Sequence, residues 1–246
     1  MKILLLITLA AVMISSSGCF PTAMLDVKPK LYQNVIYKDN DKIVLSERKS
    51  DVVLRLVDKK ISRGLKVTFW AAVINMNSPC YNFSTDNIRA KQGITPLKIF
   101  SYDEMMQEIR AGAQMRSINA QLAGLATLTN NYNAGYQYVG GNVNINGFSG
   151  NYSGYIYDQG KADESNRNII NDTNSKLNSI YSDEANSLTT LYNTYIKKQT
   201  ICTKQVNGGN FIITTNKSDM PSDDIEIVIN VDGDDHEFTI TNTLVD

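Results

Sequence analysis

Two hydrophobic periods alternate along the chain and predict a mixed α+β fold. From residue 34 to residue 100, and again after residue 203, apolar and polar residues alternate at the period of two that half-buried strands show. The expected strands are 34–38, 42–46, 51–57, 65–75, 81–90, 96–100, 210–214, 225–231 and 237–243. Short strands at this spacing are typical of an immunoglobulin-like β-sandwich. Trp70, the only tryptophan, is expected to fill its core.

Between the two β segments the apolar residues recur at helical spacing. Ser101 and Glu104 have the spacing of a capping box, which predicts a helix from there to about residue 130. Its apolar face carries Met115, Ile118, Leu122 and Leu125. A second row is small throughout and consists of Ala113, Ser117, Ala120 and Gly124. Small side chains let another backbone come close, either that of a partner helix in the same chain or that of another subunit.

A second helical pattern covers about 161–198. One face of it carries Leu177, Tyr181, Leu188, Leu191 and Tyr195. Its first half is rich in asparagine, which has a low helix propensity, so that half needs a packing partner. We therefore expect an antiparallel helical hairpin, inserted as residues 101–202 into a sandwich made of 34–100 and 203–246.

The segment between the two helices, residues 131–160, has an unusual composition. It contains six Tyr, seven Gly, six Asn and a single charge, Asp158. Asn146-Gly147 is a favoured hairpin dipeptide, so part of this loose loop should be a β-hairpin at the tip of the helices. Tyrosine among small residues makes good contact surfaces; a spacer and a self-associating tract are the alternatives. The candidate binding residues are Tyr136, Tyr138, Phe148, Tyr152, Tyr155 and Tyr157.

The N-terminus has the pattern of an export signal. Lys2 precedes an apolar run over residues 3–14, and small residues follow. As a helix this run rises about 18 Å, short of the roughly 30 Å core of a bilayer. Residues 1–18 are therefore expected to be a cleaved signal peptide, and residues 19–33 a tether.

Ser16-Ser17-Gly18-Cys19 resembles the lipobox of bacterial lipoproteins. The resemblance implies that Cys19 becomes the diacylated mature N-terminus and that the lipid holds the protein on the membrane. Phe20 follows in place of the aspartate that usually marks inner-membrane retention, which implies the outer membrane. The whole layout loosely resembles uncharacterised bacterial surface lipoproteins with a β-sandwich and a Tyr/Gly-rich insertion.

Three cysteines are present, and acylation of Cys19 would leave Cys80 and Cys202. In an oxidising compartment such a pair tends to form a disulfide; two separate thiols are the alternative. The two residues bracket the helical insertion, so their bond would close a loop of about 122 residues.

The sequence lacks the usual motifs of catalysis and of nucleic-acid binding. No nucleophile, metalloprotease or phosphate-loop motif occurs, and no basic block accompanies the net charge of −1. The only histidine is His236. It lies within residues 232–237, a predicted hairpin turn or, alternatively, a weak calcium-like site. We expect no catalytic residue, no metal site, no cofactor and no nucleic-acid partner.

These patterns together predict a non-enzymatic, lipid-anchored lipoprotein of the outer membrane. It would act as a binding or scaffold module, contacting a protein or cell-wall component of the envelope through the helical hairpin and its tip. One alternative is a self-assembling structural subunit of an envelope complex. The other is a metal-dependent carbohydrate-binding protein or enzyme that uses residues 232–237.

Overall fold

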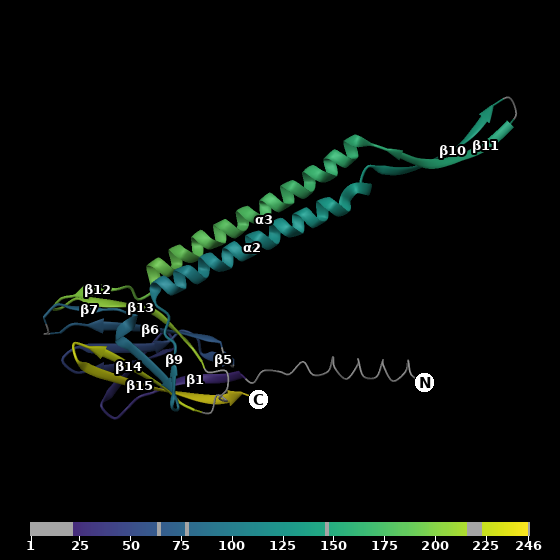
Figure 1. Ribbon diagram of the computed structural model, residues 1–246. Coiled ribbons are helices and arrows are strands. Elements are labelled where there is room, and N and C mark those ends of the chain that lie inside the picture. Colours follow the sequence, from purple (N-terminus) through teal and green to yellow (C-terminus); the bar gives the residue numbers. More distant parts are fainter. Residues whose placement is uncertain (1–21, 63–64, 77–78, 146–147, 216–222, 246) are drawn as a thin grey trace, which may run out of the picture. The chain divides into compact units, whose positions relative to one another are not determined.

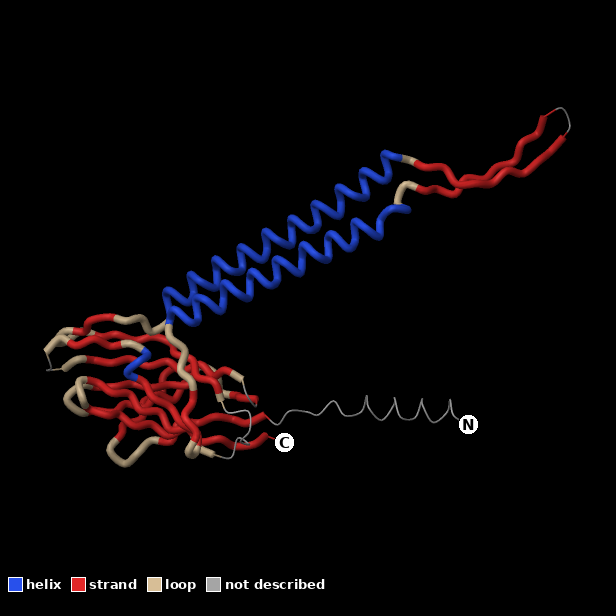
Figure 2. Tube along the Cα trace, in the orientation of Figure 1, coloured by secondary structure: helices blue, strands red, loops and turns tan. Residues whose placement is uncertain are grey.

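The computed structural model describes residues 22–62, 65–76, 79–145, 148–215 and 223–245. The chain divides into two compact units (Figures 1 and 2). One unit joins the residues up to Tyr102 with those from Thr194 onwards, and the other is Asp103–Asn193. The first unit consists mainly of antiparallel strands and the second of two helices and a β-ribbon. The α+β class is therefore confirmed.

The first unit contains a six-stranded antiparallel sheet. Its strands, in spatial order, are β5 (Lys60–Ser62), β1 (Thr22–Lys28), β15 (Asp234–Val245), β14 (Ile225–Val231), β8 (Ile88–Gln92) and β9 (Thr95–Leu97). A five-stranded antiparallel sheet has the order β13 (Val206–Thr214), β6 (Lys66–Ile74), β4 (Asp51–Leu56), β3 (Asp41–Glu47) and β2 (Gln33–Lys38). A separate pair joins β7 (Tyr81–Phe83) to β12 (Gln199–Ile201).

Both sheets contribute to one hydrophobic core. Apolar residues at alternate strand positions fill it, such as Val52 and Leu54 of β4 and Ile227 and Ile229 of β14. All four side chains are fully buried. Burial of an aliphatic side chain contributes about 1.5–3 kcal/mol relative to exposure. The alternation seen in the sequence therefore reflects a real inward face on each sheet, as a sandwich requires.

Three details of the predicted β region were wrong. Residues 22–28 do not belong to a tether, because Ala23, Leu25 and Val27 are buried and β1 pairs with β15 along its whole length. The predicted strand 81–90 is divided in two by η1 (Thr85–Asn87), a 3-10 turn with a capping box at Ser84. Trp70 does not fill the core; it is half-buried, and the Arg55 guanidinium lies 5.3 Å from its ring centroid.

The second unit is a helical hairpin that carries a β-ribbon. Helix α2 covers Tyr102–Asn130 and helix α3 covers Gln159–Thr194. Between them lie η2 (Asn131–Asn133), β10 (Tyr136–Ile145) and β11 (Phe148–Tyr157). The two helices run side by side and antiparallel in Figures 1 and 2, and the ribbon joins their ends. The predicted hairpin is thus present, although α3 ends at Thr194 and residues 195–202 belong to the first unit.

The helices pack through the row of small residues on α2. Ala113, Ser117 and Gly124 are buried, and a Cβ built on Gly124 would lie 2.5 Å from Oγ1 of Thr173 on α3. Position 124 therefore requires glycine, because α3 approaches too closely to leave room for a side chain. The two alternatives for this row are resolved in favour of the partner helix in the same chain.

The large apolar residues of α2 do not form its packing face, contrary to the simplest interpretation of the sequence. Met115, Ile118, Leu122 and Leu125 are 43–60% exposed. On α3 the predicted face is correct in part: Leu191 is buried, whereas Tyr181 is 52% exposed. Leu177 and Leu188 are partly buried. Tyr195 lies beyond the helix end, is buried in the first unit and donates its hydroxyl to the Phe100 carbonyl at 2.6 Å.

Candidate functional site

The ribbon formed by β10 and β11 is more regular than the predicted loose loop. Ten residue pairs connect the strands, from Tyr136 with Tyr157 to Ile145 with Phe148. The closing pair flanks the predicted Asn146-Gly147 dipeptide, which itself lies outside the described residues. Among the described strands, β10 and β11 pair only with each other, so each has a free edge and the ribbon leaves both faces open.

Four tyrosines occupy one face of the ribbon next to the helices. Tyr136 and Tyr157 are directly opposite, with ring centroids 5.1 Å apart, and Tyr138 and Tyr155 follow at 5.5 Å. Both pairs have edge-to-face geometry, which the ring quadrupole favours. The four side chains are nevertheless 51–73% exposed. We call these four residues the tyrosine quartet.

The rest of that face is small and polar. Because the side chains of a strand alternate between faces, Gly140 and Asn142 of β10 share the face of the quartet. Asn151 and Ser153 of β11 do so as well. This combination offers broad aromatic surface and uncharged hydrogen-bonding groups, with little side-chain entropy to lose on binding.

Asp158, the single charged residue of segment 131–160, has a structural role at the base of the ribbon. Its carboxylate accepts a hydrogen bond from the Lys161 backbone amide at 3.2 Å, which caps the start of α3. The same carboxylate accepts from the side-chain amide of Gln137 at 3.1 Å, and the Lys161 ammonium donates to Gln137 at 2.8 Å. The ribbon is therefore tied to the first turn of α3.

A second set of contacts connects the segment that follows α2 to α3. The side-chain amide of Asn131 donates to Ser165 Oγ at 2.9 Å and to Asn166 Oδ1 at 3.0 Å. Gly135 is buried, and a Cβ built there would lie 2.5 Å from a ring carbon of Tyr157. These contacts hold the quartet at a defined position relative to the helix ends.

The quartet lies in a stretch of chain without any charge. No Asp, Glu, Lys, Arg or His occurs from Ser117 to Tyr157. This stretch includes the second half of α2 and both ribbon strands. Phosphate groups and charged lipid headgroups are bound mainly by cationic side chains, so this surface is suited to uncharged partners.

The predicted binding residues divide into two groups in the structure. Tyr136, Tyr138, Tyr155 and Tyr157 come together as the quartet. Phe148 and Tyr152 pair in backbone register with Ile145 and Gly141, but their side chains lie outside the described part of the chain. Cys19 also lies outside it. The sequence signal for the quartet is the spacing of two on each strand together with the hairpin dipeptide.

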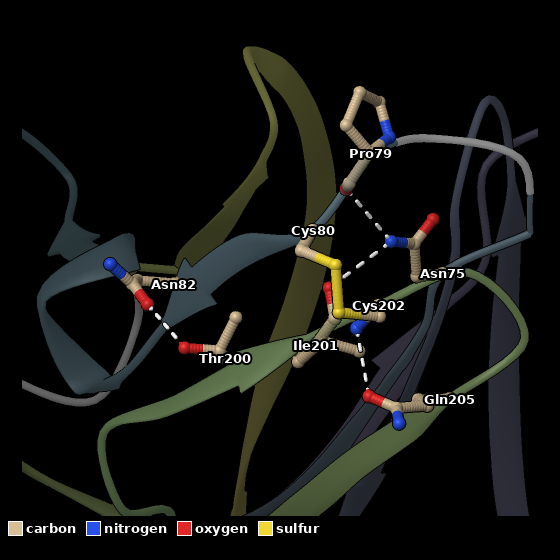
Figure 3. The surroundings of a disulfide bond; sticks show 8 residues. All are labelled: Asn75, Pro79, Cys80, Asn82, Thr200, Ile201, Cys202 and Gln205. Atoms are coloured by element: carbon tan, nitrogen blue, oxygen red, sulfur yellow. Dashed lines mark hydrogen bonds between the residues drawn. A yellow bond between two sulfur atoms is a disulfide. The ribbon is translucent and has the colours of Figure 1, made fainter.

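Cys80 and Cys202 form the predicted disulfide (Figure 3), with a sequence separation of 122. The surrounding hydrogen bonds hold both cysteine segments in place. The Asn75 side-chain amide donates to the carbonyls of Pro79 at 3.1 Å and of Ile201 at 3.2 Å, on either side of the bond. The amide of Cys202 donates to Oε1 of Gln205 at 2.8 Å.

Segment 232–237 contains a hairpin turn, as the first alternative predicted: Asp232 and Gly233 form the turn, and residues 234–237 begin β15. Asp232 and Gly233 adopt positive φ angles of 50° and 85°, as type I′ turns require. His236 lies inside the sandwich, fully buried, with Nδ1 at 3.0 Å from Ser46 Oγ on the opposite sheet. Burial lowers its pKa to about 4, with a smaller lowering by the Arg48 charge.

The described residues contain neither a metal-ligand cluster nor a membrane-spanning helix. No three His, Cys, Asp or Glu side chains lie close enough together to hold a metal ion. Neither helix in the described part combines the length and the hydrophobicity needed to cross a membrane.

Comparison with known proteins does not place the chain in a family. No protein-family model, no curated protein and no solved structure matches it.

Proposed function

We propose that this protein is a non-enzymatic binding module of the bacterial cell envelope whose contact surface is the tyrosine quartet. The observation that carries the proposal is the exposure of four aromatic side chains, 51–73% each, on a ribbon that is tied to two helix ends. Exposed aromatic residues on a rigid support are typical of protein interfaces, where tyrosine is among the most frequent hot-spot residues.

The partner that fits this surface best is an uncharged patch on another envelope protein. The quartet offers ring surface and hydroxyl groups, and its neighbours Asn142, Asn151 and Ser153 offer amide and hydroxyl groups. A partner rich in cations or anions would gain little from a surface without charge. An uncharged cell-wall polymer is the second candidate, because sugar rings also stack on aromatic side chains.

The location of the module forms part of the same proposal. A lipid on Cys19 would attach the chain to the outer membrane; the support is the lipobox-like Ser16-Ser17-Gly18-Cys19 and the apolar run before it. The Cys80–Cys202 disulfide fits an oxidising compartment. Within this proposal the sandwich is of immunoglobulin-like type, supported by two antiparallel sheets around one core.

A crosslinking pull-down from intact envelopes tests the contact surface. All four tyrosines of the quartet are replaced by threonine, which keeps a high strand propensity and removes the rings. We expect this variant to lose the crosslinked partners of the wild-type chain. Digestion of the material that the wild-type chain captures shows whether the partners are proteins or cell-wall fragments. A partner list unchanged by the four substitutions would refute the proposal.

Two further variants serve as controls. The first removes two exposed tyrosines that lie elsewhere, Tyr37→Thr on β2 (72% exposed) and Tyr181→Ala on α3 (52% exposed), and should capture the same partners as the wild type. The second is Cys19→Ser. Mass spectrometry of the purified wild type should show acylation that this variant lacks; an unmodified wild-type N-terminal peptide would refute the lipid anchor.

A further inference from the structure

A second row of residues on α2 has the spacing of a coiled-coil seam. Met115, Ile118, Leu122 and Leu125 follow one another by three, four and three residues, which are the a and d positions of two heptads. Their exposed fractions are 60%, 43%, 58% and 58%. We call these four residues the apolar seam.

The seam is separate from the row through which α2 packs on α3. At 100° per residue, the centre of the seam lies about 150° around the helix from the centre of the row that contains Ala113 and Gly124. That row is occupied by α3, as the contact of Gly124 with Thr173 shows. α3 therefore cannot cover the seam.

Apolar surface continues from the seam onto one flank of the hairpin. Leu125 and Leu128 of α2, together with Ile170 and Leu177 of α3, line a groove of about 250 Å³ whose lining has no charged residue. The groove on the opposite flank is lined by Asp172 and Lys176 together with hydroxyl, amide and small or apolar side chains such as Ala120 and Ile169. The hairpin thus has one groove without charge and one that contains charged residues.

The residues beside the seam identify the kind of partner. In coiled coils, charged side chains at the e and g positions select the partner by attraction or repulsion. Here those positions are uncharged: Gln114, Asn119, Gln121, Ala126 and Leu128. An identical seam can therefore approach without like-charge repulsion, and no charge pattern marks a different partner.

We infer that the apolar seam binds the same seam of a second copy of this chain, so that two α2 helices form the centre of a homodimer. Such a contact is isologous, with the same four residues contributed by each copy. Two heptads make a small interface, so the dissociation constant should lie in the micromolar range, roughly 1–100 μM. Attachment of both copies to one membrane would raise their effective concentration.

Sedimentation equilibrium of the chain from residue 19 onwards, with Cys19→Ser to prevent acylation, tests this inference. The wild-type seam should give a reversible monomer–dimer equilibrium. Leu122→Glu with Leu125→Glu introduces four charges into the contact and keeps helix propensity, so the dissociation constant should rise at least about 100-fold. The matched control, Ala123→Glu with Thr127→Glu, adds the same charge away from the seam and should dimerise like the wild type.

Two outcomes would overturn the inference. One is a wild-type chain that stays monomeric at several hundred micromolar, which is several times the upper end of the expected range of roughly 1–100 μM. The other is a seam variant that dimerises as well as the control. If circular dichroism at 222 nm shows that the glutamate variant has lost helix, Leu122→Gln with Leu125→Gln replaces it. The threonine variant of the tyrosine quartet should still dimerise, which separates this inference from the proposed binding surface.

Discussion

Lowering the pH from 7.5 to 5.5 should destabilise the sandwich, because its only histidine is buried in the neutral form. His236 has no exposed surface, and its ring bridges the two sheets through Ser46. Its Nε2 is buried without a hydrogen-bond partner in the described structure. A proton on the ring would place a charge there that the nearby carboxylates of Asp234 and Asp235 compensate only in part, and such a buried charge is costly in a protein interior.

The size of the effect follows from the pKa of His236 in the two states. That pKa is about 4 in the folded chain against 6.5 for a free histidine. The unfolded chain therefore binds more protons between these values, and stability falls as the pH falls through 6.5 toward 4. Proton linkage gives a loss of about 1.4 kcal/mol at pH 5.5 and about 3 kcal/mol at pH 4.

The charged groups near His236 shift its pKa in opposite directions, and the net shift remains downward. Arg48 lowers its pKa, whereas Asp234 and Asp235 raise it. The carboxylates Asp235 and Glu237 have pKa values below their usual range, because of hydrogen bonds from Asn230 and Lys30 respectively. Their own contribution is lost only below about pH 4.5, so the interval from pH 7.5 to 5.5 reports on the histidine.

Urea unfolding followed by tryptophan fluorescence measures the loss. Trp70 is the only tryptophan and lies on β6, so its emission reports on the sandwich alone. His236→Asn keeps an acceptor near the Ser46 hydroxyl but cannot titrate, and its free energy of unfolding should be the same at both pH values. A wild-type change below about 0.4 kcal/mol, or an equal change in the variant, would contradict the buried neutral histidine.

Two further predictions concern the links that hold each unit. Replacing Cys80 and Cys202 by serine should lower the free energy of unfolding of the sandwich by up to about 5 kcal/mol, because the bond removes the loop-closure entropy of 122 residues from the unfolded chain. The same urea titration measures this loss. A loss below about 1 kcal/mol would show that the bond does not constrain the unfolded chain. Asp158→Ala should lower the stability of the helical hairpin by about 1 kcal/mol through the lost cap of α3, seen as a lower melting temperature at 222 nm. Asp163→Ala, at an exposed position further along α3, removes only a surface hydrogen bond from Gln159 and should lower the melting temperature less.

Strand positions could be predicted from the sequence wherever alternation stood out against turn residues. β14 was predicted at its observed bounds, Ile225–Val231, because polar residues flank it on both sides in the sequence. β1 was missed although Ala23, Leu25 and Val27 alternate with Met24 and Asp26. Two nearby prolines favoured a tether, and pairing with the distant β15 is a long-range property that local pattern does not contain.

The packing of the helices could not be predicted from hydrophobicity. The large residues of α2 gave the stronger signal, but the small row that includes Ala113 and Gly124 is the one that packs on α3. Close helix contact gains dispersion energy over the whole backbone, and large side chains at the contact would push the helices apart. Which of two rows is buried depends on a partner helix that the pattern of α2 alone does not specify.

The stability of the ribbon depends on the residues at its base. A two-stranded ribbon is marginally stable by itself in water, and this one contains Gly140, Gly141, Gly150 and Gly154, which add no side-chain contacts. Its stability must therefore come from its base, where two aromatic pairs each add about 0.5–1.5 kcal/mol and Asp158 and Asn131 tie it to the helices. The same tyrosines that support the ribbon are 51–73% exposed. A partner that covers the quartet would thus further stabilise a ribbon that is already tied to the helices through Asp158 and Asn131.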